Sequence, residues 1–121
     1  MAGRKSSGGK YKKARKKKSY ELQGQQRVVK LGEKKAKPVK GMGGKKKLVS
    51  LSHSEANVVD KGKSKKTSIK TVLETPANRF LARQNILVKG AIIETELGKA
   101  IITNRPSQEG IVQAKMLQNQ E

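Results

Sequence analysis

Alternating apolar and polar residues in the C-terminal two thirds of the chain predict a series of short β-strands. Three strands are expected at residues 47–52, 55–60 and 66–74, and a turn containing Gly and Ser at residues 61–64 separates the last two. Because the connections are short, these three strands are predicted to form a meander.

A short helix is predicted after the third strand. Thr75 suits the N-cap and Pro76 suits the first helical position, where its missing N–H costs no hydrogen bond. One or two turns should follow, with Arg79 and Arg83 four residues apart on an accessible face. A different face, predicted to lie in the core, comprises Ala77, Phe80 and Leu81.

The rest of the chain is predicted to form further strands. Residues 86–95 are the most apolar stretch and are rich in β-branched residues, and Gly90 is expected to bend the strand there. Two more strands are expected at residues 100–103 and 111–117, joined by a turn at 104–110. About six short strands, one short helix and no internal repeat predict a mainly β fold, a small antiparallel β-barrel, because closure removes exposed strand edges.

The N-terminal part of the chain differs in composition. Residues 1–47 contain eighteen Lys or Arg and two acids, whereas residues 48–121 contain eleven Lys or Arg and seven acids; the whole chain has a net charge of +20. With few apolar residues and no helical stripe, residues 1–47 are predicted to be a long basic extension, disordered when free and ordered by RNA. Residues 48–121 are predicted to form the barrel domain, with residues 27–31 as an optional edge strand on it.

Nucleic acid phosphate is the leading candidate for the partner of this extension, because two acids cannot neutralise eighteen bases. RNA is favoured over DNA, since no helix-turn-helix, zinc-finger or basic-zipper pattern is present and long basic arms suit folded RNA. The few aromatic residues limit base stacking, so phosphate and shape contacts are expected. A plain linker or a localisation signal stays open as the alternative for the basic runs.

Other classes of partner have little support in the sequence. No stretch approaches the roughly 20 apolar residues of a membrane span, and neither a secretion signal nor a myristoylation glycine is present, so no membrane partner is expected. The absence of cysteine excludes disulfides and thiolate zinc sites, and it fits a reducing compartment.

Catalytic chemistry is nearly absent from the sequence. His53 is the only histidine and is expected to lie in a surface loop, because no second histidine or cysteine accompanies it. Glu94 and Glu96 share a strand face beside a turn, where paired carboxylates are usually solvated. Residues 41–47 (G-M-G-G-K-K-K) resemble a phosphate-binding loop, but lysine stands where Ser or Thr is required. We therefore expect no enzyme, no metal and no cofactor.

One long stretch resembles the signature of a known family. Residues 75–79 (T-P-A-N-R) and 85–98 (N-I-L-V-K-G-A-I-I-E-T-E-L-G) are similar to the P-A-N-R…N-I-x-x-K-G-A-I-I-E-T-x-x-G block of the eukaryote-type small-subunit ribosomal protein eight family, in its short archaeal form. Weaker similarities in the same order lie at residues 8–11, 20–22, 43–47, 56–58 and 103–110.

The resemblance implies a small β-barrel with basic extensions, a structural constituent of the small ribosomal subunit in the cytoplasm. It implies contacts with small-subunit ribosomal RNA and neighbouring ribosomal proteins, and no enzymatic activity; no homo-oligomer is expected. The chain departs from the family pattern at residues 22–26, where the usual G-R-x-P is replaced, and at Ser107, where glycine is common.

The residues expected to bind RNA are the basic positions that match the family, together with Arg83, which is added because of its helical spacing from Arg79. They are Lys10, Lys12, Lys13, Arg15, Lys16, Lys17, Lys18, Lys45, Lys46, Lys47, Arg79, Arg83, Lys89 and Arg105.

Two further functions stay open. A ribosome-assembly factor of the large subunit resembles the same barrel, but it is a longer chain with a helical N-terminal region. A sequence-independent RNA chaperone would also be basic, and it would bind unrelated nucleic acids and release them at moderate salt.

Overall fold

The structure is a computed structural model that describes residues 3–12 and 14–117. Of the residues expected to bind RNA, Lys13 lies outside the described residues. The described elements in chain order are the 3-10 turn η1 (Ser19–Glu21), β1 (Lys30–Leu31), β2 (Lys35–Lys40), the 3-10 turn η2 (Met42–Gly44), β3 (Lys46–His53), β4 (Glu55–Asp60), β5 (Lys63–Glu74), α1 (Arg79–Arg83), β6 (Ile92–Thr95), β7 (Gly98–Ile102), α2 (Pro106–Glu109) and β8 (Gln113–Met116).

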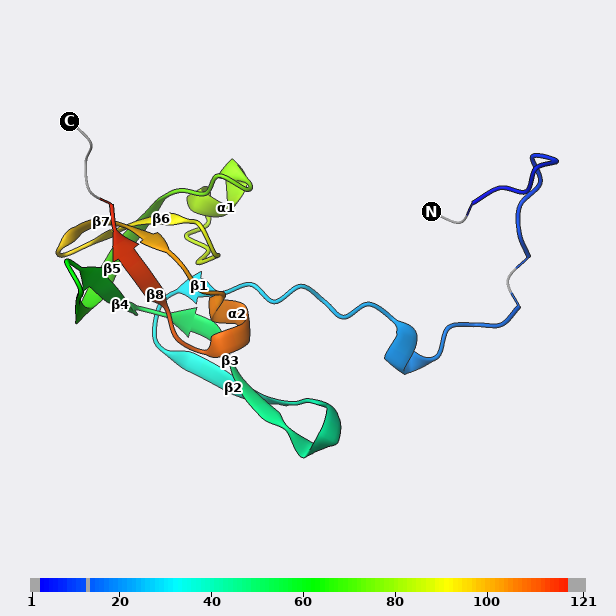
Figure 1. Ribbon diagram of the computed structural model, residues 1–121, viewed down its shortest axis with the longest axis horizontal. Helices are drawn as coiled ribbons and strands as arrows, with labels where there is room; N and C mark the ends of the chain where they lie inside the picture. Colours follow the sequence, from blue (N-terminus) through cyan, green and yellow to red (C-terminus); the bar gives the residue numbers. More distant parts are fainter. Residues whose placement is uncertain (1–2, 13, 118–121) are drawn as a thin grey trace.

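Five of the strands close into a barrel in the order β4-β5-β6-β7-β8 (Figure 1). Consecutive strands pair antiparallel, and a parallel pairing of β4 with β8 completes the ring. The prediction of a mainly β fold built on a small barrel is confirmed. The barrel has five strands, and the described residues form three more outside it, in place of about six in all.

The three other strands form a second sheet in the order β1-β3-β2. The predicted meander is wrong, because β3 pairs with β1 and β2 and not with β4. Only Ser54 separates β3 from β4, and one residue is too short for a hairpin loop, whose common minimum is two. The chain therefore bends at Ser54 and passes from one sheet into the other.

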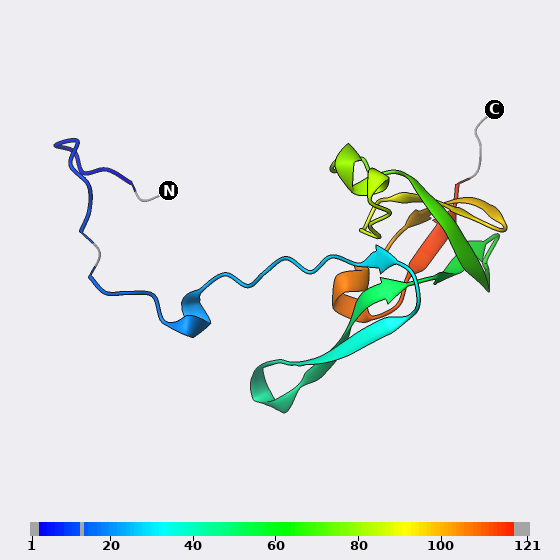
Figure 2. The ribbon, with the colours of Figure 1, turned by 180° about the vertical axis from the view of Figure 1, so that it is seen from behind.

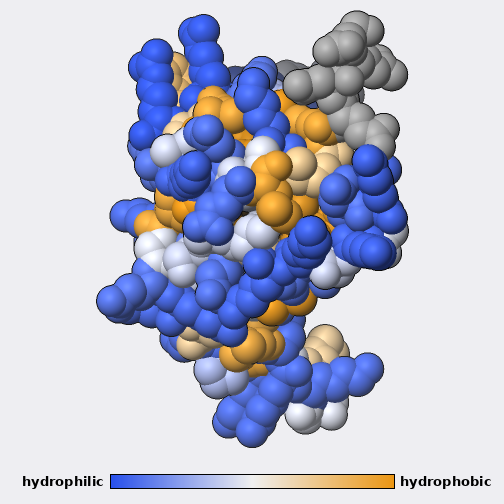
Figure 3. All heavy atoms as spheres, turned by 90° about the vertical axis from the view of Figure 1, so that its left-hand side faces the viewer, coloured by the Kyte–Doolittle hydropathy of each residue, from blue (hydrophilic) through white to orange (hydrophobic). Residues whose placement is uncertain are grey.

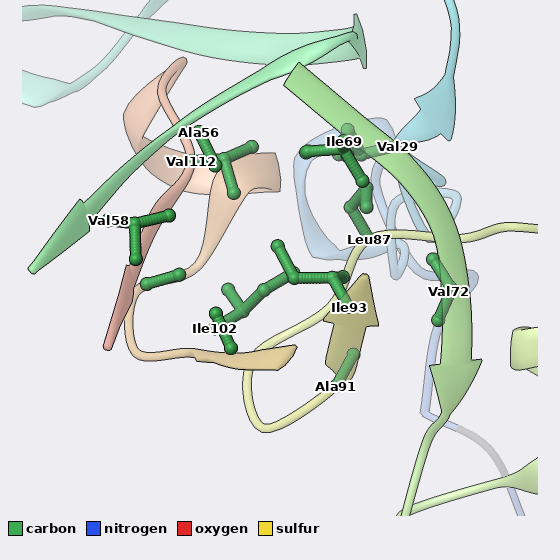
Figure 4. Close-up of a cluster of buried hydrophobic side chains, with 12 residues drawn as sticks. Val29, Ala56, Val58, Ile69, Val72, Leu87, Ala91, Ile93, Ile102 and Val112 are labelled. Carbon is green, nitrogen blue, oxygen red and sulfur yellow. The ribbon is translucent and has the colours of Figure 1, made fainter. Parts of the chain in front are cut away.

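The barrel is filled by small and β-branched side chains that alternate with outward residues along the strands. Inward residues of β7, for example, are Ala100 and Ile102, which are 0% and 1% exposed. A five-stranded barrel encloses little space, which explains the alanines among its buried residues. The close-up in Figure 4 shows these side chains converging from the surrounding strands. The cluster comprises Val29, Ala56, Val58, Ile69, Val72, Leu87, Ala91, Ile93, Ala100, Ile102, Val112 and Ala114.

Val29 ties the N-terminal part of the chain to this core. It is 1% exposed, and its carbonyl accepts a hydrogen bond from the Leu87 N–H at 2.9 Å. Immediately after it, β1 pairs in parallel with the end of β3. The expected edge strand within residues 27–31 is thus confirmed for two residues. The division of the chain after residue 47 stays a prediction. This boundary falls within β3, and β2 pairs with residues of β3 on both sides of it.

The helix α1 begins later than predicted. Asn78 and not Thr75 is its N-cap, and the Asn78 side-chain oxygen accepts from the Phe80 N–H at 3.0 Å. Thr75 is 2% exposed and precedes a turn. The predicted core face is also wrong, because Phe80 is 55% exposed and Ala77 is exposed as well.

Two segments differ from their prediction as a bent strand and a turn. Residues 86–91 run without strand pairing, apart from a bridge between Ile86 and Lys30, and the strand begins only at Ile92. The bend at Gly90 is confirmed by its φ of +84°. Residues 104–110 contain α2, with Pro106 at its first position and Gly110 as a left-handed C-cap. This Pro-to-Gly pattern is a helix signal that the turn prediction missed.

Candidate nucleic-acid interface

The β2–β3 hairpin is the most basic part of the described body. Residues 34–54 contain seven lysines and no acid, and the hairpin projects from the body in both ribbon views (Figures 1 and 2). Lys40 lies directly opposite Lys46 in the register, and both are exposed. Like charges opposite each other are unfavourable in a sheet, so a polyanion would relieve this arrangement. The lysines are Lys34, Lys35, Lys37, Lys40, Lys45, Lys46 and Lys47.

The glycines of the hairpin tip allow another molecule to approach the backbone closely. Gly43 and Gly44 have φ of 68° and 73°, values that favour glycine. The Gly41 N–H donates to the Lys45 carbonyl at 2.6 Å and closes the tip. Met42, at the apex, is 93% exposed. Behind the tip, the Lys47 ammonium donates to the side chain of Gln108 on α2, which joins the hairpin to that helix.

The second basic site is the exposed face of α1. The guanidinium carbons of Arg79 and Arg83 lie 5.6 and 5.7 Å from the centroid of the Phe80 ring. These distances are those of cation–π interactions. The two arginines therefore flank an aromatic side chain that is more than half exposed. Both cations can pair with phosphates, and the ring offers a stacking surface to a base.

The described N-terminal residues, 3–12 and 14–28, are all exposed. They include Lys10, Lys12 and the basic run from Arg15 to Lys18, all expected to bind RNA. Arg15 makes a bidentate contact with Glu21 at 2.7 and 2.6 Å. This contact, together with the Lys18 N–H, lowers the pKa of Glu21. The guanidinium of Arg15 is therefore partly occupied within the chain, and the lysines that follow it are the freer cations.

Lys89 and Arg105 are exposed on two separate loops. Arg105 is the N-cap residue of α2, the helix that packs on β3 and carries Gln108, so it shares this part of the body with Lys47. Lys89 follows Leu87 at the edge of the core, on the segment that pairs with β1. The structure thus groups Lys45, Lys46, Lys47 and Arg105 around the hairpin and α2, and it groups Arg79 and Arg83 on α1.

The hairpin and α1 lie on different sides of β1, the strand at which the N-terminal segment joins the body (Figure 1). Figure 3 shows the side of the barrel away from the N-terminal segment, where apolar patches are interrupted by hydrophilic side chains and the lower lobe is fringed by them. The N-terminal segment therefore leaves the body between two basic surfaces.

Sequence reasoning missed the lysines of β2 as site residues. Strand pairing places Lys40 opposite Lys46, whereas Lys35 and Lys37 lie farther along the same hairpin, opposite Ser52 and Val49. The alternation in K-A-K-P-V-K is a strand signal, but it was hidden by its position inside a segment expected to be disordered.

His53 is not the surface-loop residue that was expected. It ends β3 and is 5% exposed. Its Nδ1 accepts from the Glu55 N–H at 3.4 Å. Burial lowers the pKa of His53, and the nearby charges of Lys34 and Lys66 lower it further.

The carboxylates make ordinary contacts. Glu96 accepts from the Ser68 hydroxyl at 2.6 Å, and Glu94 lies 3.5 Å from the Thr71 hydroxyl. Over residues 3–12 and 14–117 no group of three or more His, Cys, Asp or Glu side chains is placed to hold a metal ion. The same residues include no helix long and apolar enough to cross a membrane.

Comparison with known proteins finds matches among proteins of the small ribosomal subunit. The family model described as "Ribosomal protein S8e" matches residues 2–117. The "Small ribosomal subunit protein eS8" of Nanoarchaeum equitans (strain Kin4-M) is 43% identical over 108 residues, which cover 88% of this chain and 85% of that protein. The protein of the same name from Methanocorpusculum labreanum (strain ATCC 43576 / DSM 4855 / Z) is 40% identical over 117 residues, covering 95% and 94%.

These matches define a structural protein of the small ribosomal subunit. The chain belongs to the ribosomal protein S8e family. Its family is structural and not enzymatic, and its place is the small subunit of cytoplasmic ribosomes, where it takes part in translation. The resemblance described from the sequence is confirmed.

Proposed function

We propose that this protein binds small-subunit ribosomal RNA mainly through phosphate and shape contacts. The observation that carries the proposal is the hairpin, which places seven lysines and no acid within residues 34–54. Its exposed lysines lie on a paired scaffold, so binding does not require all of them to be ordered from a disordered state. The barrel acts as a passive scaffold that presents this surface.

The α1 cluster is the second proposed contact. Arg79 and Arg83 pair with phosphates, and the exposed Phe80 ring accepts an unpaired base. One exposed ring supplies a local contact and not the bulk of the affinity. The remaining expected RNA-binding positions, from Lys10 to Lys18 with Lys89 and Arg105, add charge on the N-terminal segment and on the two loops.

The N-terminal segment is proposed to enter folded RNA and to become ordered there. Ordering costs about 1–2 kcal/mol per residue, which phosphate contacts and counterion release must offset. Its exposure along the whole described length supports this proposal, since no part of it is committed to the core. Neighbouring ribosomal proteins are the further partners proposed, with no homo-oligomer.

The test compares binding of the full chain to small-subunit ribosomal RNA and to unrelated RNA of equal length, from low to physiological salt. About ten phosphate contacts predict a log–log slope of roughly −7 to −9. Preference for the ribosomal RNA that survives physiological salt supports the proposal. Equal binding that collapses with salt would instead describe a general RNA chaperone, and sedimentation with precursor particles only would describe an assembly factor.

A further inference from the structure

A small cavity of about 80 Å³ lies where the two sheets meet. Its polar walls come from four separate places in the chain: Lys34 just before β2, His53 at the end of β3, Glu55 and Asn57 on β4, and Lys66 on β5. A single water needs about 10–15 Å³, so this space admits a group of several polar atoms. It is far too small for a nucleobase with its sugar.

His53 contributes an unsatisfied donor to this region. The ring is 5% exposed, and its Nδ1 is the acceptor for the Glu55 N–H at 3.4 Å. In the neutral imidazole the proton therefore lies on Nε2. Nε2 is buried and has no hydrogen-bond partner among the residues that the structure describes. A buried donor of this kind is unfavourable unless an acceptor meets it.

The charges around the cavity select an anion as that acceptor. Glu55 is paired with Lys66 at 2.6 Å, so the carboxylate and one ammonium offset each other. Lys34 has no ion-pair partner within residues 3–12 and 14–117. It is exposed to solvent at the base of the hairpin, directly before β2. The same cavity is thus lined by an uncompensated cation, Lys34, and by His53, which carries a buried N–H donor.

We propose that this cavity binds a single phosphate group of RNA, held by the Nε2–H of His53 and the ammonium of Lys34. The inference rests on the proposed function and adds a specific position to it. Lys34 is the first lysine of the basic hairpin, so a strand of RNA that follows the hairpin lysines has a phosphate available at its base. His53 is held at the end of the paired strand β3, whereas the described lysines of the N-terminal segment are exposed and outside any strand.

The proposal is tested by following the imidazole of His53 by NMR in the full chain. His53 is the only histidine, so its ring signals need no assignment by mutation. The pKa of His53 is measured in chloride, in inorganic phosphate and in acetate at equal ionic strength. Phosphate is expected to raise this pKa above its value in chloride, because an anion favours the imidazolium held between Lys34, Glu55 and Lys66. Equal values in phosphate and chloride, or an equal rise in acetate, would overturn the proposal.

Matched lysine variants show whether the effect is local. Lys34→Gln should weaken the phosphate-dependent shift at least threefold. Lys63→Gln, which removes the same charge from an exposed position on β5, should leave it unchanged. Equal losses in the two variants would mean general screening and would overturn the site.

The RNA arm of the experiment separates this inference from the proposed function. Ribosomal RNA that binds with preference and shifts the His53 ring signals, with a smaller shift in Lys34→Gln, supports both. Preferential RNA binding that leaves the His53 signals unchanged overturns the phosphate site and leaves the proposed function standing. A phosphate-dependent pKa without preferential RNA binding overturns RNA as the source of the phosphate, together with the proposed function.

Discussion

Replacing Lys40, Lys45 and Lys46 by Gln should weaken RNA binding and flatten its dependence on salt. These three lysines surround the hairpin tip, and all are exposed. Each phosphate contact contributes about 0.7 to the log–log slope on single strands and about 0.9 on duplexes. Loss of three contacts should therefore make the slope shallower by about 2 to 3.

The same variant should fold at least as well as the original protein. Lys40 and Lys46 are directly opposite in the antiparallel register, and removing a like-charge pair of this kind raises the free energy of unfolding by about 0.2–1 kcal/mol. Thermal unfolding measures this term separately from binding. A variant that binds RNA poorly and melts no lower has lost contacts and not structure.

The matched control replaces Lys63, Lys65 and Lys70 on β5 by Gln. It removes the same three charges from positions that are also exposed, but outside the hairpin. Binding is measured by fluorescence anisotropy with a labelled ribosomal RNA fragment over a series of salt concentrations. If both triple variants flatten the slope equally, net charge alone decides affinity, and the reasoning that assigns the contact to the hairpin is refuted.

Three further predictions concern other parts of the molecule. Replacing residues 16–18 by Glu should weaken RNA binding and leave the melting temperature of the body unchanged; a lower melting temperature would show that this segment supports the fold. Gly110→Ala should lower the free energy of unfolding by about 2–4 kcal/mol, because the added Cβ meets Leu48 at 3.0 Å and φ is +72°. The control Gly43→Ala, which has a similar φ of +68° but open space around the added Cβ, should lower it by only about 1 kcal/mol. Equal losses of stability in thermal unfolding would contradict the steric reason. Acid should destabilise the protein through His53, because burial lowers the pKa of His53 in the folded state. The contribution of the neutral imidazole to stability is complete above the unfolded pKa of about 6.5, and it is lost as the pH falls from there towards the folded pKa. Melting temperatures compared across pH should show a smaller loss in His53→Gln.

The strands were largely predictable because period-two alternation reports local burial. The segments 55–60 and 63–74 alternate and are joined by Lys61 and Gly62, both with positive φ (44° and 80°), which is the two-residue turn that suits a hairpin. Pairing was less predictable. β3 and β4 each have a strand pattern, but the pattern alone does not show that the chain changes sheets at Ser54.

The α1 region shows a second limit of prediction from the sequence. Phe80 has the spacing of a core residue, and in a longer helix that spacing would place it against a neighbouring element. Here α1 has only five residues, and Leu81 and Ala82 rather than Phe80 are partly buried. The aromatic ring is left to its two arginines, an arrangement visible only in three dimensions.

The candidate site was predictable in its charge and not in its grouping. The basic runs are evident in the sequence, but the alignment of β2 beside β3 depends on a pairing across residues expected to be unstructured. The cavity at His53 was hidden for the same reason, since its walls come from residues 34, 53, 55 and 66, which no local pattern relates.

The burial of Val29 fixes one end of the N-terminal segment and so determines how that segment can search for RNA. From Gly3 to Val28 the chain spans at most about 90 Å when fully extended, so every lysine within it stays inside that radius of the docked barrel. Binding of the segment then becomes an intramolecular step with an effective concentration set by this tether. Its individually weak phosphate contacts need no high protein concentration, because the barrel supplies the local concentration for them.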